Sequence, residues 1–172
     1  MATKRTENRN VQILFIEDNP DEVVHIRHVL SEKNGDATHF RLFHAPRLED
    51  GLYFLGEESI DVVLIDQHEH ETDALTQLRS KNHEVPIVVL TALKDRENGS
   101  QLVSLGAQDY IVKDQVTHSL LCRTLLHAIE RHKIHREHLS LANELRRANV
   151  RLEKLVYSDY LTGLMKIGRA HV

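Results

Sequence analysis

The sequence predicts an α/β fold in which helices cover both faces of a doubly wound, five-stranded parallel sheet. Short, almost wholly apolar runs alternate along the chain with segments whose apolar residues recur at helical spacing. Such runs are typical of strands that are buried on both faces, as in a parallel sheet. Their alternation with helices indicates a layered α/β domain. The 172 residues, 41% of them hydrophobic and 28% charged, suffice for one such domain and an appendage.

Five segments are predicted to be strands, and each is followed by a segment with helical periodicity. The strands are expected at residues 11–16, 39–44, 61–65, 86–90 and 109–112. The helices are expected at residues 20–35, 48–55, 73–81 and 95–105, and from residue 117 onward. Pro20 suits the start of the first helix, because its missing N–H would lack a partner there. The pair at 34 and 35, Asn-Gly, suits the end of that helix.

Polar side chains stand where four of the predicted strands end. Glu17 and Asp18 follow the first strand, Asp66 the third, Thr91 the fourth and Lys113 the fifth. Because the carboxyl ends of parallel strands meet at one edge of the sheet, we expect these groups to lie close together. Three neighbouring carboxylates repel one another unless a cation lies among them. Mg²⁺, a hard cation that prefers oxygen ligands, is the predicted occupant.

This set of side chains is suited to phosphoryl transfer. A carboxylate can attack phosphorus and form an acyl phosphate. Lys113 would add a positive charge for the phosphate oxygens, and Thr91 would donate a hydroxyl hydrogen bond. Taken singly, each residue could equally be a turn residue, a helix cap or a solvated lysine. Their joint occurrence in strand order favours a functional site.

The ordered set resembles the receiver domain of two-component response regulators over residues 10–130. The matching segments are FIEDNP, VVLID, VVLTA and GAQDYIVK. The resemblance implies a flavodoxin-like sheet with strand order 2-1-3-4-5. It also implies a signalling module that takes a phosphoryl group from a histidine kinase or a histidine phosphotransfer protein. Such a module is not an enzyme beyond its own phosphorylation and dephosphorylation.

The resemblance implies a role for each of these residues. Asp66 would be the phosphoacceptor, and Thr91 and Lys113 would bind the phosphoryl group. Tyr110 matches the aromatic switch of the family, whose ring turns inward when the threonine shifts toward the phosphate. The implied Mg²⁺ ligands are Glu17, Asp18, Asp66 and the backbone carbonyl of His68.

Three features bear on how closely the chain follows that family. Asp114 stands where the family usually has a proline after the lysine, and a cis bond without proline is costly. The segment 67–74 lacks the usual proline and glycine. No glycine-rich turn follows the first strand, which argues against a dinucleotide or ATP enzyme. A phosphatase with an aspartyl nucleophile would need an Asp-x-Asp there, whereas Glu17 and Asp18 are adjacent.

The C-terminal helix carries a heptad pattern that predicts a coiled coil. The spacings alternate between four and three residues, which is typical of a left-handed supercoil. The seam residues are Ile134, His138, Leu141, Leu145, Ala148, Leu152 and Leu155. We expect residues 131–157 to be a signalling helix that forms a parallel homodimer; the alternative is a single helix lying along another surface. A helix over residues 117–157 would be about 60 Å long.

Residues 158–164, SDYLTGL, resemble the opening DxLTGL of GGDEF domains, which make cyclic di-GMP from GTP. The next residues depart from that family. We therefore interpret residues 158–172 as the remnant of a GGDEF domain start with a foreign tail, and the full-length parent as a diguanylate cyclase. The alternative function is a stand-alone or vestigial receiver that acts in dimerisation or protein interaction without phosphorylation.

The remaining expectations follow from composition. Residues 1–9 are polar, with no apolar run behind them, and predict a disordered tail rather than a signal peptide. The formal net charge of −4 gives no reason to expect nucleic acid as a partner. No stretch has the length of a membrane-spanning helix. A single cysteine, Cys122, fits a cytoplasmic protein.

Overall fold

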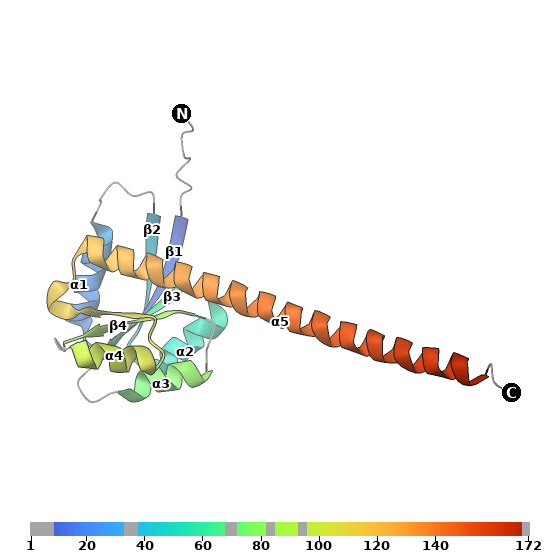
Figure 1. Ribbon diagram of the computed structural model, residues 1–172. Coiled ribbons are helices and arrows are strands. Elements are labelled where there is room, and N and C mark those ends of the chain that lie inside the picture. The colour runs from blue at the N-terminus through green and yellow to red at the C-terminus, as the bar shows by residue number, and fades with distance from the viewer. Residues whose placement is uncertain (1–8, 33–37, 68–71, 82–84, 93–95, 170–172) are drawn as a thin grey trace. The chain divides into compact units, whose positions relative to one another are not determined.

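The computed structural model describes residues 9–32, 38–67, 72–81, 85–92 and 96–169, and five parallel strands form its central sheet (Figure 1). The strand order is β2-β1-β3-β4-β5, and every neighbouring pair is parallel. The predicted fold class and strand order are therefore confirmed. The strands are β1 Arg9–Ile16, β2 Thr38–Ala45, β3 Val62–Gln67, β4 Ile87–Thr91 and β5 Asp109–Val112.

Helices cover both faces of the sheet. Helices α1 and α5 pack on one face, while α2, α3 and α4 pack on the other (Figure 1). A short 3₁₀ turn, η1 Lys113–Gln115, joins β5 to α5. The α-helices are α1 Pro20–Ser31, α2 Leu48–Glu57, α3 Thr72–Lys81, α4 Arg96–Ser104 and α5 His118–Arg169.

The central parts of the inner strands are mostly apolar because successive side chains enter two different cores. In β1, Ile13 and Phe15 pack with the helices α1 and α5, whereas Leu14 and Ile16 pack with α2, α3 and α4. Side chains of a strand alternate between the two faces of a sheet, so a strand covered on both faces favours apolar residues at successive positions. The first polar residue after such a strand therefore marks the edge of the sheet.

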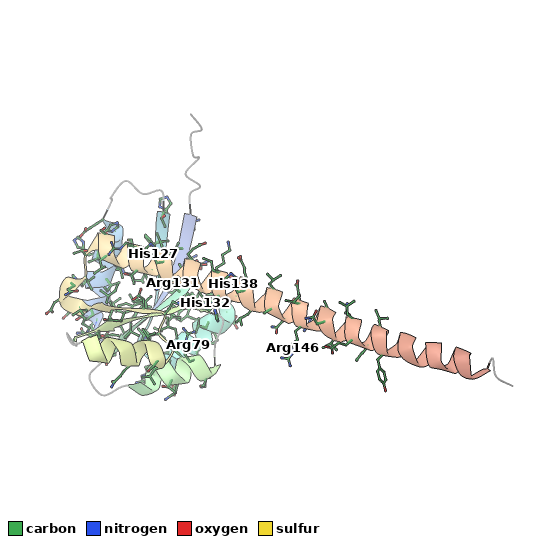
Figure 2. The ribbon with its side chains drawn as sticks, viewed as in Figure 1. Arg79, His127, Arg131, His132, His138 and Arg146 are labelled. Carbon is green, nitrogen blue, oxygen red and sulfur yellow. The ribbon has the colours of Figure 1, made fainter. Side chains whose placement is uncertain are left out.

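Arg79 of α3 fastens the helical layer that contains α3 and α4. Its side chain is labelled in Figure 2. Its Nε donates to the carbonyl of Gly106 over 2.7 Å, and its Nη1 donates to the carbonyl of Val85 over 2.9 Å. Gly106 has a φ of +105°, a backbone conformation that favours glycine. The turn between α4 and β5 is thus fixed to the helix that precedes β4.

Two sequence expectations differ from the structure. Strand β1 begins at Arg9, inside the predicted tail, because Arg9 and the next residue pair with Thr38 and His39 of β2. Helix α5 ends at Arg169 instead of residue 157, and no proline interrupts it. The bond between Lys113 and Asp114 is trans, since the described residues contain no cis peptide bond. The predicted helix end at residues 34 and 35 lies outside the described residues.

The chain divides into two units, Met1–His132 and Lys133–Val172. The first contains the sheet, and the second contains the C-terminal part of α5. In the second unit the leucines of the predicted seam are exposed to solvent, with Leu141 and Leu155 both 66% exposed. None of the helices in the described ranges is both long enough and apolar enough to cross a membrane.

Candidate functional site

The predicted site residues lie at the carboxyl edge of the sheet. Asp66 is the penultimate residue of β3 and pairs with Leu90 of β4, while Thr91 ends β4. Asp66 is 8% exposed and Thr91 is 2% exposed. The strands end side by side because their register is nearly flush, with Thr91 opposite Val112 at the end of β5. Parallel pairing thus brings together residues that are far apart in the sequence.

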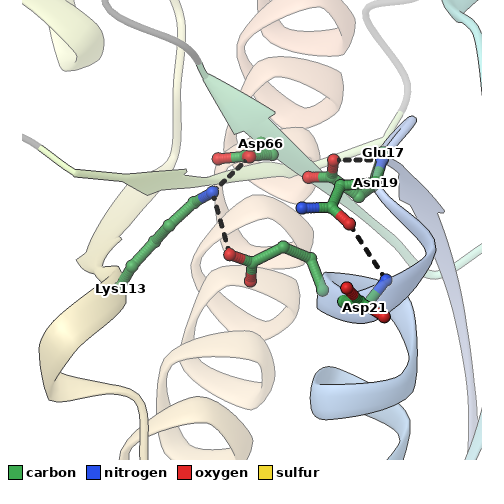
Figure 3. Close-up of polar contacts among 6 residues, drawn as sticks. Glu17, Asn19, Asp21, Asp66 and Lys113 are labelled. Atoms are coloured by element: carbon green, nitrogen blue, oxygen red, sulfur yellow. Dashed lines mark hydrogen bonds and ion pairs between the residues drawn. The ribbon is translucent and has the colours of Figure 1, made fainter.

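Lys113 forms an ion pair with Asp66 (Figure 3). Its Nζ also lies 3.4 Å from Oε1 of Glu22, a residue in the first turn of α1. Burial alone would lower the pKa of Lys113, but Asp66, Glu22 and Glu17 outweigh that effect and raise it. Lys113 therefore keeps its positive charge at the acceptor carboxylate.

Glu17 is a buried carboxylic acid with little solvation. It is 3% exposed, and its Oε2 atom has no hydrogen-bond partner among the described residues. Its Oε1 accepts the backbone N–H of Asn19 over 2.7 Å (Figure 3). Burial raises the pKa of Glu17 to about 8, and the neighbouring carboxyl groups of Asp66 and Asp18 add to the rise, against the Asn19 hydrogen bond.

Asn19 links Glu17 to the first helix. Its side chain accepts the N–H of Asp21 over 3.0 Å and so caps α1, with Pro20 at the first helical position. Its own N–H holds Glu17. The EDNP segment therefore starts the helix and orients a site carboxylate at the same time.

The donor atoms around Glu17 suit a hard divalent cation. A buried carboxylate with an unpartnered oxygen, close to a second buried carboxylate, is stabilised by a nearby positive charge. Mg²⁺ usually keeps several waters and uses few protein carboxylates. Among the described residues, no three acidic, histidine or cysteine side chains form a ready-made metal-binding group. His68, the fourth predicted ligand, lies outside the described residues.

A cleft of about 250 Å³ opens beside Asp66. Glu17, Asp18 and Asp66 line it from the ends of β1 and β3. The connection between β2 and α2 lines it as well, and this connection includes Arg47. The cleft therefore adjoins the carboxyl group of Asp66.

Tyr110, the predicted switch residue, lies on β5 and pairs with Val89 of β4, two residues before Thr91. It is half-buried, and its ring packs against Gly99 of α4 so closely that a Cβ on Gly99 would overlap the ring. The ring therefore occupies space that exists because residue 99 has no side chain. Its role as a switch stays a prediction.

Sequence reasoning missed Glu22 and Arg47. Glu22 contacts Lys113 across 91 residues of sequence, and Arg47 reaches the cleft from the loop after β2. A signal existed for Glu22, because an acidic residue in the first turn of a helix that starts at the sheet edge lies near the site. Arg47 carried no such signal, since its position depends on how α2 packs on the sheet.

The fold and this arrangement of acids and lysine define a signalling receiver of the α/β class. Residues 13–125, more than half of the chain, match the response regulator receiver domain family. The chain therefore belongs to the response regulator receiver domains of two-component systems.

Curated relatives carry the same domain. The chain is 29% identical over 107 residues to the transcriptional regulatory protein MalR of Bacillus subtilis, a match covering 60% of this chain and 44% of MalR. It is 30% identical over 106 residues to the transcriptional regulatory protein PhoP of Escherichia coli, covering 60% and 45%. The chain thus spans less than half the length of these relatives.

Solved structures show the same fold. The receiver domain of Francisella response regulator 1452 matches with a TM-score of 0.59 at 23% identity, covering 71% of this chain and 98% of that one. A response regulator receiver domain from Clostridium thermocellum matches with a TM-score of 0.59 at 26% identity, covering 72% and 98%.

Proposed function

We propose that Asp66 accepts a phosphoryl group from a sensor histidine kinase or a histidine phosphotransfer protein. The observation that carries this proposal is the ion pair between the buried Asp66 and Lys113, next to Glu17. A buried carboxylate that keeps a cation on one oxygen, at the wall of an open cleft, is placed to act as a nucleophile on phosphorus. Membership in the receiver family supports the same role.

The reaction follows from these groups. A carboxylate oxygen of Asp66 forms a bond to phosphorus as the bond from phosphorus to the donor nitrogen breaks, and the electron pair stays with that nitrogen. The carboxylate charge is then lost and new charge lies on the phosphoryl oxygens. The Lys113 ammonium group would move its hydrogen bond to those oxygens, and the Thr91 hydroxyl would donate to another.

We propose Glu17, Asp18, Asp66 and the carbonyl of His68 as the residues that hold Mg²⁺. When bound, the ion supplies positive charge that offsets the charge of the phosphoryl oxygens. Glu17 would then hold its carboxylate in the charged form, because a cation replaces the proton that burial favours.

We propose further that the signal passes along α5 to an output domain. The seam leucines are exposed, and pairing two such helices in parallel would bury them. Residues 158–164 support a diguanylate cyclase as the output. MalR and PhoP are transcriptional regulators, but their matches with this chain cover less than half of their length.

Beryllofluoride, a phosphoryl mimic that binds carboxylates, tests the acceptor role. In Mg²⁺, fluorine NMR should detect bound beryllofluoride on the wild-type chain and none on Asp66→Asn. Asp50→Asn, an exposed aspartate on α2, is the matched control and should bind like wild type. Absence of a bound signal from the folded wild type would instead favour an interaction module that works without phosphorylation.

A further inference from the structure

Acidic side chains outnumber cationic side chains in the lining of the cleft beside Asp66. Three of its lining residues are acids, Glu17, Asp18 and Asp66. A phosphoryl donor brings further negative charge into this space. Lys113 does not line the cleft and is held by Asp66 and Glu22. Among the described residues that line the cleft, the one cationic side chain is that of Arg47.

Hydrogen bonds hold the segment that carries Arg47 against the site. The backbone N–H of Glu17 donates to the carbonyl of Ala45 over 3.0 Å. The ring of His44 lies 2.8 Å from the carbonyl of Glu17 through its Nε2 atom, which donates to that carbonyl. The end of β2 is therefore bound to the residue that also lines the cleft, and Arg47 follows two positions later.

Helix α2 packs closely against this edge of the sheet. Gly51, in its first turn, lies against Ile16, and a Cβ at Gly51 would come within 2.6 Å of the Ile16 side chain. The N–H of Gly51 donates to the carbonyl of Arg47 over 3.0 Å. Because residue 51 has no side chain, the start of α2 can pack directly against the end of β1. This packing places Arg47 at the cleft.

The side chain of Arg47 is available for a ligand. Arg47 occupies the N-cap position of α2 in an extended conformation, and its side chain makes no capping hydrogen bond. Serine, threonine, aspartate or asparagine is the usual residue at an N-cap, because a side-chain oxygen accepts an N–H of the first turn. Arginine offers no acceptor, so its presence here gives α2 no capping benefit. Its planar guanidinium group suits the oxygens of a phosphate.

We propose that Arg47 is a binding residue for the incoming donor and contacts its phosphoryl oxygens at the α2 side of the cleft. The ligand class is a small anionic phosphodonor, either an acyl phosphate or a phosphoramidate. This inference rests on the proposed function of Asp66. Lys113 pairs with the acceptor Asp66 and would bind the phosphoryl group after transfer, whereas Arg47 would bind the donor before transfer.

The test measures phosphorylation rates of the full chain in Mg²⁺ across a range of acetyl phosphate and phosphoramidate concentrations. Arg47→Ala should raise the half-saturating concentration of both donors about fivefold, the scale of one charge-assisted hydrogen bond at an exposed site. The maximal rate should stay near that of wild type. Arg47→Lys should recover part of the affinity. Arg123→Ala, an exposed arginine on α5, is the matched control and should resemble wild type.

Measuring the half-saturating concentration separately from the maximal rate distinguishes a loss of donor binding from a loss of folded protein. A partly unfolded variant lowers the amount of reactive protein but leaves the half-saturating concentration unchanged. An unchanged or lowered half-saturating concentration in Arg47→Ala would overturn the role of Arg47 while the wild-type reaction upheld the proposed function. If the wild type takes no phosphoryl group from either donor, the proposed function fails first and the role of Arg47 fails with it.

Discussion

Glu17 shows how a single residue links burial to ion binding. Its pKa is raised from 4.5 to about 8, first by burial and then by the carboxyl group of Asp66. Between those two values the folded chain retains a proton that the unfolded chain has lost. The resulting stability is fully present below pH 4.5 and is lost as the pH rises through 8.

We expect the thermal unfolding midpoint of the metal-free chain to decrease as the pH is raised from about 6 to about 9, roughly the range over which Glu17 would deprotonate in the folded state. Mg²⁺ should raise the midpoint more at about pH 8.5 than at about pH 5.5, because the ion binds the deprotonated carboxylate. Thermal melts of wild type and Glu17→Gln, with and without Mg²⁺, measure both effects. Glutamine cannot titrate, so its profile should be flatter. A pH profile of Glu17→Gln identical to that of wild type would rule out Glu17 as the cause.

Single residues also show which members of the candidate site the sequence could identify. Glu17, Asp18, Asp66, Thr91 and Lys113 were predictable because each is the polar residue that ends or follows an apolar strand. The chemistry of those residue types then limited the possible ligands. Glu22 does not end or follow a strand, and its signal was its place in the first turn of the first helix. Arg47 was not predictable, because α2 had first to be placed on the sheet.

At the scale of elements, the contact between α4 and β5 depends on one glycine. The ring of Tyr110 fills the space above Gly99. An alanine there must displace the end of a flexible side chain, so the ring should move at small cost while the helix gains up to about 1 kcal/mol from replacing glycine. The ring of Tyr110 can therefore change position with little change in the stability of the domain.

We expect Gly99→Ala to shift the NMR resonances of the Tyr110 ring while the free energy of unfolding changes by less than about 1 kcal/mol. Gly56→Ala, in α2, is the matched control, because a Cβ there meets no atom within 4 Å. It should leave the Tyr110 resonances in place. Unchanged ring resonances in Gly99→Ala would show that the ring does not occupy this space in solution.

Strand positions were predictable to within about two residues, because most of the strands contain a short apolar run, which is typical of a strand buried on both faces. The start of β1 was missed, since Arg9 and Asn10 owe their strand conformation to pairing with β2 rather than to apolar content. The end of α5 was also missed. The helix continues beyond residue 157, where the heptad pattern no longer marks it.

At the scale of the whole molecule, the heptad seam supports a dimer. Leu145 and Leu152 are 63% and 60% exposed, and Val150 on the outer face of the same helix is 44% exposed. A glutamate in the seam would place a like charge opposite its copy in a parallel pair, whereas a glutamate at residue 150 would remain in solvent.

We expect the wild-type chain to be a dimer by light scattering coupled to size exclusion. Leu145→Glu and Leu152→Glu should shift it toward the monomer, and Val150→Glu should leave it dimeric. Dissociation by all three variants would indicate a general effect of charge on the helix, and dissociation by none would remove the seam as the dimer contact.

Signalling by this chain would depend on covalent transfer to Asp66, and intact-mass spectrometry measures that transfer most directly. After incubation with Mg²⁺ and acetyl phosphate, the wild-type chain should gain the mass of one phosphoryl group, and the adduct should be labile to hydrolysis as an acyl phosphate. Asp66→Asn should gain nothing. The absence of an adduct on the folded wild-type chain, or an adduct of the same mass on Asp66→Asn, would contradict the assignment of Asp66 as the phosphoacceptor.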